Sequence, residues 1–436
     1  MPRFADLFVE ELRRRRGEVL RVVSGGEGLA ARYRELVRGV WVEGVEGRRG
    51  FERVAAVDSS SGEIEVAGGG VILATRALAL EAGGRELRRL RVDALFPRDP
   101  RDYEDFKRLL REHLEHLAAL DAVEGGADLV LLDGSLYGRM VHVLRELDVE
   151  GREDFLLEYV KTYGELLSRA AGAGALLVGV SKDSRSTVLK EELLLAELRR
   201  LLSGVEPGLR EQVMRLWGSL RRRPAGVLKA VGQLVSEGLD PAVYEIFEEA
   251  RGGAPDSKII AAASPGAGYT LPLALSLERV STGITDIALR GPGHSEEEAL
   301  GILERVFART AERDGAAFRE RAAAVLEVLR RYPTVLTTYV VFARGDDPVR
   351  VDVVAPDQPP PGGSRLVSPV PEHVERVVSH LACMYAGRRC YNALLLEADR
   401  RVRATARTME LYHRLAMREL GELIPHSRGA RRFFLP

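Results

Sequence analysis

The sequence of 436 residues contains only two cysteines, and only six of its 64 basic residues are lysines. Cys383 and Cys390 lie seven positions apart without a second cysteine pair or a histidine cluster nearby, which argues against a structural zinc site. We interpret both cysteines as incidental. The preference for arginine suits contact with phosphate, which a guanidinium binds bidentately, but we favour a GC-rich or thermophilic genome as its explanation.

The sequence also lacks an apolar run long enough to span a membrane. Its N-terminus predicts a charged amphipathic helix without the apolar core of a signal peptide, so we expect a cytoplasmic protein that does not bind membranes. The formal net charge of −1 argues against binding of nucleic acid by bulk positive charge, although a local basic groove is compatible with it. Hydrophobic residues make up 45% of the chain, enough for a sizeable core.

Residues 1–45 predict an N-terminal helical segment, and the glycines after it end the helical pattern. The next segment predicts a meander, with a strand at 54–57, a Ser/Gly turn, and two further strands separated by Gly68–Gly70. The apolar spacing that follows predicts, in order, a helix over 102–123, a strand at 129–132, a helix over 152–171 and a strand at 175–180.

Residues 186–255 have a helical pattern without a strand candidate, which predicts a helical insertion outside the sheet. Beyond it the pattern predicts strands at 258–263 and 282–289, a helix over 296–331, a hairpin of 335–342 with 349–354, a proline-rich loop at 356–363, and helices over 371–386 and 391–421. Strands on both sides of the insertion predict one α/β domain over 1–436, with a mixed sheet flanked by helices.

Two aspartates each follow a buried strand and precede small residues. Asp58 stands in VAAVDSSSG and Asp133 in LVLLDGSLYG. A carboxylate at a strand end is held rigidly, and the Ser and Gly residues after it leave room for a hydrated cation and a phosphate. Two such carboxylates can hold a pair of divalent ions about 3.5–4 Å apart, and oxygen ligands favour Mg²⁺ or Mn²⁺ over zinc.

Each aspartate taken alone is also typical of an ordinary turn. A third strand end, VGVSKDS, adds Lys182 to the same predicted edge of the sheet, where its ammonium group would hold the scissile phosphate. The coincidence of three such strand ends favours a catalytic site over three unrelated turns.

The chain carries five motifs in order: an aspartate after the first strand, a glutamate-bearing helix, a strand ending in Asp-Gly-Ser-Leu, a later Ser-Lys-Asp, and a C-terminal helix entered through a tyrosine. From about Arg53 to Arg403 the sequence resembles the archaeal NurA family of DNA-end-processing nucleases. The resemblance implies an RNase H-like core, related to that of Argonaute PIWI domains, over 46–185 and 256–436.

The resemblance also implies an activity and partners. These are manganese-dependent 5′-to-3′ exonuclease activity, single-strand endonuclease activity, a ring-shaped homodimer, and the hexameric HerA translocase as partner in DNA end resection before recombination. The N-terminal helix, with the run Arg13–Arg16, is our candidate for the segment that contacts the translocase.

Asp58 and Asp133 match the first and third acidic ligands of the family directly. The second ligand is a glutamate on the helix before the Asp-Gly-Ser strand, for which the candidates are Glu112 and Glu115; spacing favours Glu115. On a helical wheel both glutamates fall away from the apolar stripe, so an ordinary solvated face stays open as an alternative.

At the C-terminal end the family has Tyr-Pro and a histidine eight residues after the tyrosine. Here Tyr391 matches, but Asn392 stands for the proline and Asp399 for the histidine. We expect Asp399 to be a metal ligand and Tyr391 a phosphate contact, against the alternative of an ordinary helix start with a core tyrosine. The change would alter metal preference or pH dependence, because Asp titrates near about 4 and His near about 6.5.

The predicted site therefore has four metal ligands for a pair of Mn²⁺ or Mg²⁺ ions, with two further catalytic residues, Lys182 and Tyr391. The ligands are Asp58, Glu115, Asp133 and Asp399. Weaker candidates are Asp183 and Asp352, for holding an arginine or shaping the groove, and a set of arginines for tracking DNA: Arg344, Arg350, Arg400, Arg401 and Arg403. The alternatives are a catalytically weakened DNA-clamp or adaptor subunit of the translocase, and a phosphatase on the same fold.

Overall fold

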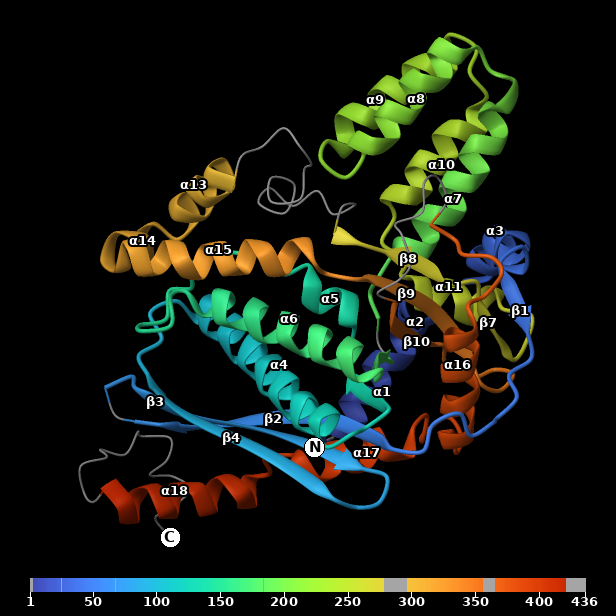
Figure 1. The fold of residues 1–436 in the computed structure, drawn as a ribbon. Helices are drawn as coiled ribbons and strands as arrows, with labels where there is room; N and C mark the ends of the chain where they lie inside the picture. Colours follow the sequence, from blue (N-terminus) through green and yellow to red (C-terminus); the bar gives the residue numbers. More distant parts are fainter. Residues whose placement is uncertain are drawn as a thin grey trace.

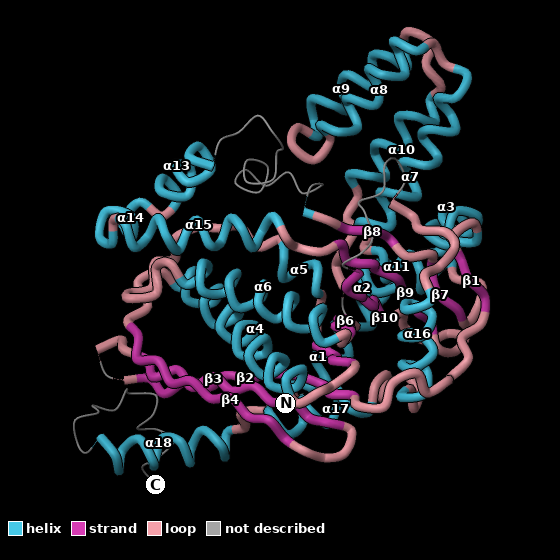
Figure 2. Tube along the Cα trace, in the orientation of Figure 1, coloured by secondary structure: helices cyan, strands magenta, loops and turns pink. Residues whose placement is uncertain are grey.

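The computed structural model describes residues 3–24, 26–66, 68–182, 184–277, 296–355 and 365–420 (Figure 1). Throughout these ranges the chain folds around a single mixed sheet of ten strands, with helices on both of its faces (Figure 2). None of the helices there is long and apolar enough to cross a membrane.

One half of the sheet is an antiparallel meander followed by two parallel strands. The meander consists of β2 (Val54–Glu65), β3 (Val71–Glu81) and β4 (Glu86–Leu95). Strand β5 (Leu129–Asp133) lies parallel to β2, and β6 (Leu176–Ser181) lies parallel to β5. The order β4-β3-β2-β5-β6 is that of an RNase H-like sheet, so the expected fold class is confirmed.

Helices α4 (Pro100–Glu124) and α6 (Phe155–Ala173) make the crossovers that parallel strands require, and they cover one face of this half (Figure 1). The start of α4 is fixed by Asp99, whose side chain accepts hydrogen bonds from the Arg101 and Asp102 amides, with Pro100 in the first turn. The end of α6 is fixed by Gly174, which adopts a left-handed conformation.

Alternate residues of β2 and β5 enter two separate cores. One core contains α4 and α6 with Ala55, Val57, Val130 and Leu132, and the other contains α16 and α17 with Val54, Ala56, Leu129 and Leu131. Because side chains of a strand alternate between faces, the next residues, Asp58 and Asp133, fall on the face of α17. Ser59 falls on the face of α4.

The other half of the sheet extends from β6 through β10. The strands β9 (Thr334–Val341) and β10 (Val349–Ala355) form the predicted hairpin. Beyond them lie three short strands, β7 (Gly268–Thr270), β8 (Leu273–Leu275) and β1 (Trp41–Glu43).

The remaining helices lie around this frame. They are α1 (Phe4–Arg14), α2 (Arg16–Ser24), α3 (Gly26–Arg38), α5 (Leu136–Met140), α7 (Val188–Leu201), η1 (Leu202–Gly204), α8 (Pro207–Ser219), α9 (Pro224–Ser236), α10 (Pro241–Arg251), α11 (Asp256–Ala263), α13 (Glu296–Val306), α14 (Ala308–Asp314), α15 (Ala316–Arg330), α16 (Glu372–Met384), α17 (Ala393–Val402) and α18 (Ala406–Leu420). Helices α8 and α9 extend away from the sheet (Figure 1). The division of the chain at residues 45, 185 and 255 stays a prediction.

Several predicted elements differ from the structure. No turn follows Val57, because β2 runs on to Glu65 and pairs with β3 along its whole length. Residues 258–263, predicted as a strand, belong to α11, whose apolar residues Ile259 and Ile260 are buried.

The predicted helix over 296–331 is three helices, and that over 391–421 is two. The predicted strand at 282–289 and the loop at 356–363 lie outside the described residues.

Candidate active site

The two strand-end aspartates are neighbours across the sheet. Parallel pairing aligns Val57 with Leu132, so the next residues in register are Asp58 and Asp133. Strand β5 ends at Asp133, whereas β2 continues past Asp58, which leaves an opening beside β2 at this level. The sequence therefore brings the two carboxylates together through strand register alone.

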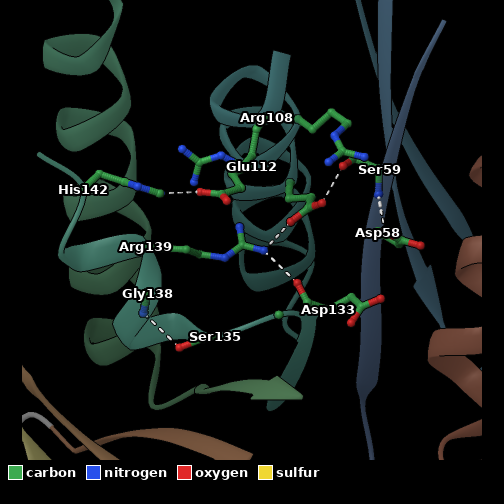
Figure 3. A pocket seen from close by; sticks show the side chains of 12 residues that line it. Asp58, Ser59, Arg108, Glu112, Asp133, Ser135, Gly138, Arg139 and His142 are labelled. Atoms are coloured by element: carbon green, nitrogen blue, oxygen red, sulfur yellow. Dashed lines mark hydrogen bonds and ion pairs between the residues drawn. The ribbon is translucent and has the colours of Figure 1, made fainter. Parts of the chain in front are cut away.

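A cavity of about 430 Å³ opens at this point (Figure 3). Residues from β2, α4, the turn after β5 and α5 line it: Asp58, Ser59, Arg108, Arg111, Glu112, Glu115, Asp133, Gly134, Ser135, Gly138, Arg139 and His142. Three of the four predicted metal ligands are among them. The cavity thus combines carboxylates with several basic side chains.

Glu115 reaches the cavity from α4, on the opposite side of β2 from Asp58. It accepts hydrogen bonds from the Ser59 hydroxyl at Oε1 and from the Arg139 guanidinium at Oε2. Its side chain is buried, because α4 packs against the sheet on one side and α6 on the other. The solvated-face interpretation of Glu115 is therefore wrong. Burial raises the pKa of Glu115, and the charge of Arg139 opposes that rise.

Arg139 is the central side chain of the cavity, and sequence analysis did not identify it. It lies on α5, which begins after the Asp-Gly-Ser turn with Ser135 as its capping residue. Besides Glu115 it binds the Asp133 carbonyl oxygen at 2.9 Å, and its Nη1 lies 3.1 Å from His116 Nε2. The available signal was an arginine within the short, otherwise uncharged segment LYGRM directly after the motif.

Glu112, the alternative ligand on α4, is engaged differently. His142 Nε2 lies 2.9 Å from its carboxylate and the Tyr159 hydroxyl donates to it at 2.6 Å. Burial would raise the pKa of Glu112, but the bond to His142 and the charge of Arg139 hold it at about 2. Glu112 is therefore a fixed anion on the cavity wall, one turn from Glu115.

The C-terminal residues lie near the aspartates on the face of the sheet opposite α4. The charge of Asp399, on α17, contributes to raising the pKa of both Asp58 and Asp133. The Lys182 ammonium lies 4.1 Å from the centre of the Tyr391 ring, and its charge acts to lower the pKa of Asp133. The structure thus brings all six predicted site residues into one region, three lining the cavity and three beside it.

Asn392 explains how α17 begins without the family's proline. Its side chain accepts a hydrogen bond from the Leu395 amide at 2.9 Å, so it is the capping residue of α17. Tyr391, just before it, is buried, and its pKa is raised by burial and by the charges of Asp133 and Asp58.

Electrostatically, the site carries excess negative charge around Asp58. Burial and then the charge of Glu115 raise the pKa of Asp58 to about 7, although the Ser59 amide donates to its carboxylate at 2.7 Å. Burial likewise raises the pKa of Asp133, opposed by the charges of Lys182 and Arg139. Carboxylates with raised pKa values in one cavity are typical of a functional site.

The four predicted ligands are not gathered around one point. Within the described ranges no three Asp, Glu, His or Cys side chains lie close enough together to hold a metal ion. Both oxygens of Glu115 are bound by Ser59 and Arg139, and Asp399 accepts a hydrogen bond from Arg403. Each carboxylate oxygen has two lone pairs, so Glu115 and Asp399 can bind a cation while these hydrogen bonds persist.

Two of the weaker predictions are resolved by burial. Asp352 is fully buried and accepts hydrogen bonds from Ser135 at 2.7 Å and Arg350 at 2.8 Å, so it fixes the turn after Asp133. Arg350 is itself buried, so the prediction that it tracks DNA is wrong.

Asp183 lies outside the described residues. The other predicted DNA-tracking arginines, Arg344, Arg400, Arg401 and Arg403, are exposed, and the last three form ion pairs with Glu397, Glu86 or Asp399.

Comparison with known proteins gives one family and a set of solved structures. The model of the NurA domain matches residues 52–404. The NurA nuclease from Sulfolobus solfataricus superposes with a TM-score of 0.55 and 15% identity, covering 98% of this chain and 100% of that chain. No curated protein matches the sequence.

More distant matches are a NurA bound to dAMP and manganese, with a TM-score of 0.36, 14% identity and 95% of each chain covered, and the endonuclease V of Ciona intestinalis in complex with DNA. The latter has a TM-score of 0.17 and 14% identity, and covers 41% of this chain and 67% of that chain. Because the family model spans most of the sequence, this chain belongs to the NurA family.

Proposed function

We propose that this protein is a divalent-metal-dependent DNA nuclease whose catalytic centre is the cavity around Asp58 and Asp133. The observation that carries the proposal is the register of β2 and β5, which puts two carboxylates in the lining of one cavity in a chain of the NurA family. The volume of about 430 Å³ is within the range of sites that bind a ligand the size of a nucleotide.

The donor set fits Mn²⁺ or Mg²⁺. Asp58 and Asp133 are the primary ligands in our proposal, and Glu115 and Asp399 complete the set for two ions. All of the donors are carboxylate oxygens, which suit hard divalent cations. A cation would also relieve the repulsion that contributes to the raised pKa of Asp58. When bound, the ions would activate water and stabilise the leaving oxygen of the phosphodiester.

The protein's own side chains supply positioning and charge. Lys182, held against the ring of Tyr391, is exposed and close enough to Asp133 to affect its pKa, so we assign it to the scissile phosphate. Tyr391 supports Lys182 and borders the substrate. Arg139 holds Glu115 and the turn after β5 in place.

Family membership supports the finer parts of the proposal. We propose 5′-to-3′ exonuclease and single-strand endonuclease activity in a homodimer, acting in the cytoplasm with a HerA-type hexameric translocase. The role would be the resection of DNA ends before repair of double-strand breaks by recombination.

The test is degradation of end-labelled single- and double-stranded DNA with Mn²⁺. Asp58→Asn and Asp133→Asn keep the side-chain volume and should each abolish cleavage. The matched control is Asp347→Asn, an exposed aspartate that pairs with Arg388, which should leave cleavage unchanged. Wild-type protein that binds DNA without cleaving it would favour the adaptor alternative, and hydrolysis of small phosphoesters without cleavage of DNA would favour the phosphatase.

A further inference from the structure

The cavity has a basic side that the proposed metal chemistry does not use. Arg108 and Arg111, both on α4, line it together with the carboxylates. Figure 3 shows the Arg108 side chain reaching from α4 toward Ser59. The two arginines therefore line the same cavity as Asp58 and Asp133, with Asp58 on the opposite side of β2 from α4.

The two arginines and Glu115 lie in sequence along one rigid element. Arg111 precedes Glu115 by four residues and Arg108 precedes it by seven, which corresponds to about 6 Å and about 10 Å along the axis of α4. The basic groups are therefore arranged at increasing distance from the proposed metal site.

Neither arginine is tightly bound to a carboxylate. Arg108 pairs with Asp105 at 3.0 Å, three residues before it, and both side chains are more than 40% exposed, so this pair is weak. Arg111 is exposed and makes no hydrogen bond or ion pair with any of the described residues. The other basic groups of the cavity, Arg139 and His142, are bound to Glu115 and Glu112.

We propose that Arg108 and Arg111 form a second phosphate subsite, which binds a phosphate of the same DNA strand near the cleaved bond. This inference rests on the proposed function. Phosphates of one strand recur every ~3.4 Å of helix axis, so the two arginines lie within about three nucleotides of the bond at the carboxylates. A guanidinium binds a phosphate through two parallel hydrogen bonds, which fixes the strand as well as attracting it.

The experiment is equilibrium binding of a fluorescent single-stranded oligothymidine over a range of salt concentrations, with Ca²⁺ in place of Mn²⁺ to separate binding from cleavage. For single strands the slope of log K against log [salt] falls by about 0.7 for each phosphate that the protein no longer neutralises. We expect Arg108→Gln and Arg111→Gln each to weaken binding, and the double variant, which no longer neutralises this phosphate, to reduce the slope by about 0.7.

Two controls separate a phosphate contact from a structural effect. The double variant Arg108→Lys with Arg111→Lys keeps both charges and should retain most of the wild-type slope. Arg101→Gln removes an exposed arginine of the same helix that does not line the cavity, and should leave the slope unchanged. Wild-type affinity and slope in the double glutamine variant would overturn the proposal.

The phosphate can be terminal or internal, and a comparison of oligonucleotides distinguishes the two. If it is terminal, removing the end phosphate weakens wild-type binding as much as the double variant does, and the double variant no longer responds. If it is internal, replacing one phosphate near the cleaved bond with a neutral methylphosphonate weakens wild-type binding to that extent. The double glutamine variant then no longer responds to the replacement. Absence of Mn²⁺-dependent cleavage by wild-type protein would refute the nuclease proposal. It would leave the phosphate subsite untouched, because the salt slopes are measured without cleavage.

Discussion

Arg139 is a buried cation among groups that all depend on it: the Glu115 carboxylate, the Asp133 carbonyl and His116. Removing one partner of a buried ion pair leaves the other charge without compensation, which costs about 3–5 kcal/mol. We expect Arg139→Met to lower the free energy of unfolding by that amount, measured by denaturant titration. Adding Glu115→Leu to it should restore much of the loss.

The exposed pair of Arg98 with Glu150 provides the control for Arg139. Its two side chains are 54% and 61% exposed, so Arg98→Ala should cost at most about 1 kcal/mol. An Arg139→Met variant as stable as Arg98→Ala would show that the buried pair has no structural role.

Asp58 should make the protein less stable as the pH rises. Its folded pKa of about 7 lies above the ordinary value of 3.8, so the folded state favours the protonated carboxyl and loses stability between about pH 4 and pH 7, where the unfolded chain is already ionised. With EDTA present, Asp58→Asn should therefore be more stable than wild type at pH 8, by about 2–4 kcal/mol.

The difference in the free energy of unfolding between Asp58→Asn and wild type should shrink on acidification and vanish near pH 4. Denaturant titration at each pH measures it. Mn²⁺ should reverse the order at pH 8, because the ion stabilises only the protein that binds it. An Asp58→Asn variant that is less stable than wild type at pH 8 in EDTA would contradict the assignment.

At the level of elements, the turn after β5 depends on a glycine in the neighbouring strand. A Cβ atom on Gly179 of β6 would lie 2.6 Å from the Gly134 carbonyl oxygen and 2.9 Å from the Leu136 amide nitrogen. We expect Gly179→Ala to displace this turn, to cost about 1–3 kcal/mol as overpacking does, and to reduce cleavage because Asp133 and α5 move with the turn.

Gly172 on α6 is the matched control for Gly179, since no atom lies within 4 Å of its added Cβ. Gly172→Ala should leave cleavage unchanged and raise stability by about 0.4–1 kcal/mol, as replacement of a helical glycine does. Equal cleavage rates in the two alanine variants would show that the packing of the turn on β6 does not position the site.

The sequence predicted those elements whose own residues show the apolar pattern of a strand or helix. The buried strands β5 and β6, and the small residues behind Asp133, are visible in the sequence, and so the pair Asp58 and Asp133 was identified. Strand β2 beyond Val57 is different, because its residues SSSGEIE resemble a turn and become a strand only through pairing with β3. Arg139 was missed for a related reason, since its role depends on tertiary packing against Glu115 of α4, 24 residues earlier in the chain.

At the scale of the whole molecule, α1 stands apart from the packed core. None of its residues is buried, and Phe4 and Phe8 are 91% and 65% exposed. Within the run Arg13–Arg16, Arg14 and Arg15 pair with Glu11, which reduces the free positive charge beside this helix. We therefore attribute the proposed contact with the HerA-type translocase to the apolar face of α1, with the charges serving solubility.

That assignment predicts different effects for different changes in one helix. Deleting residues 1–20, or substituting Phe4→Ser with Phe8→Ser, should abolish co-purification with the translocase and leave Mn²⁺-dependent cleavage by the nuclease alone unchanged, because α1 does not line the cavity. Arg13→Gln, which alters charge beside the same face, should preserve co-purification. If both serine substitutions leave the complex intact while Arg13→Gln disrupts it, the contact is electrostatic, and the apolar face of α1 is not the docking surface.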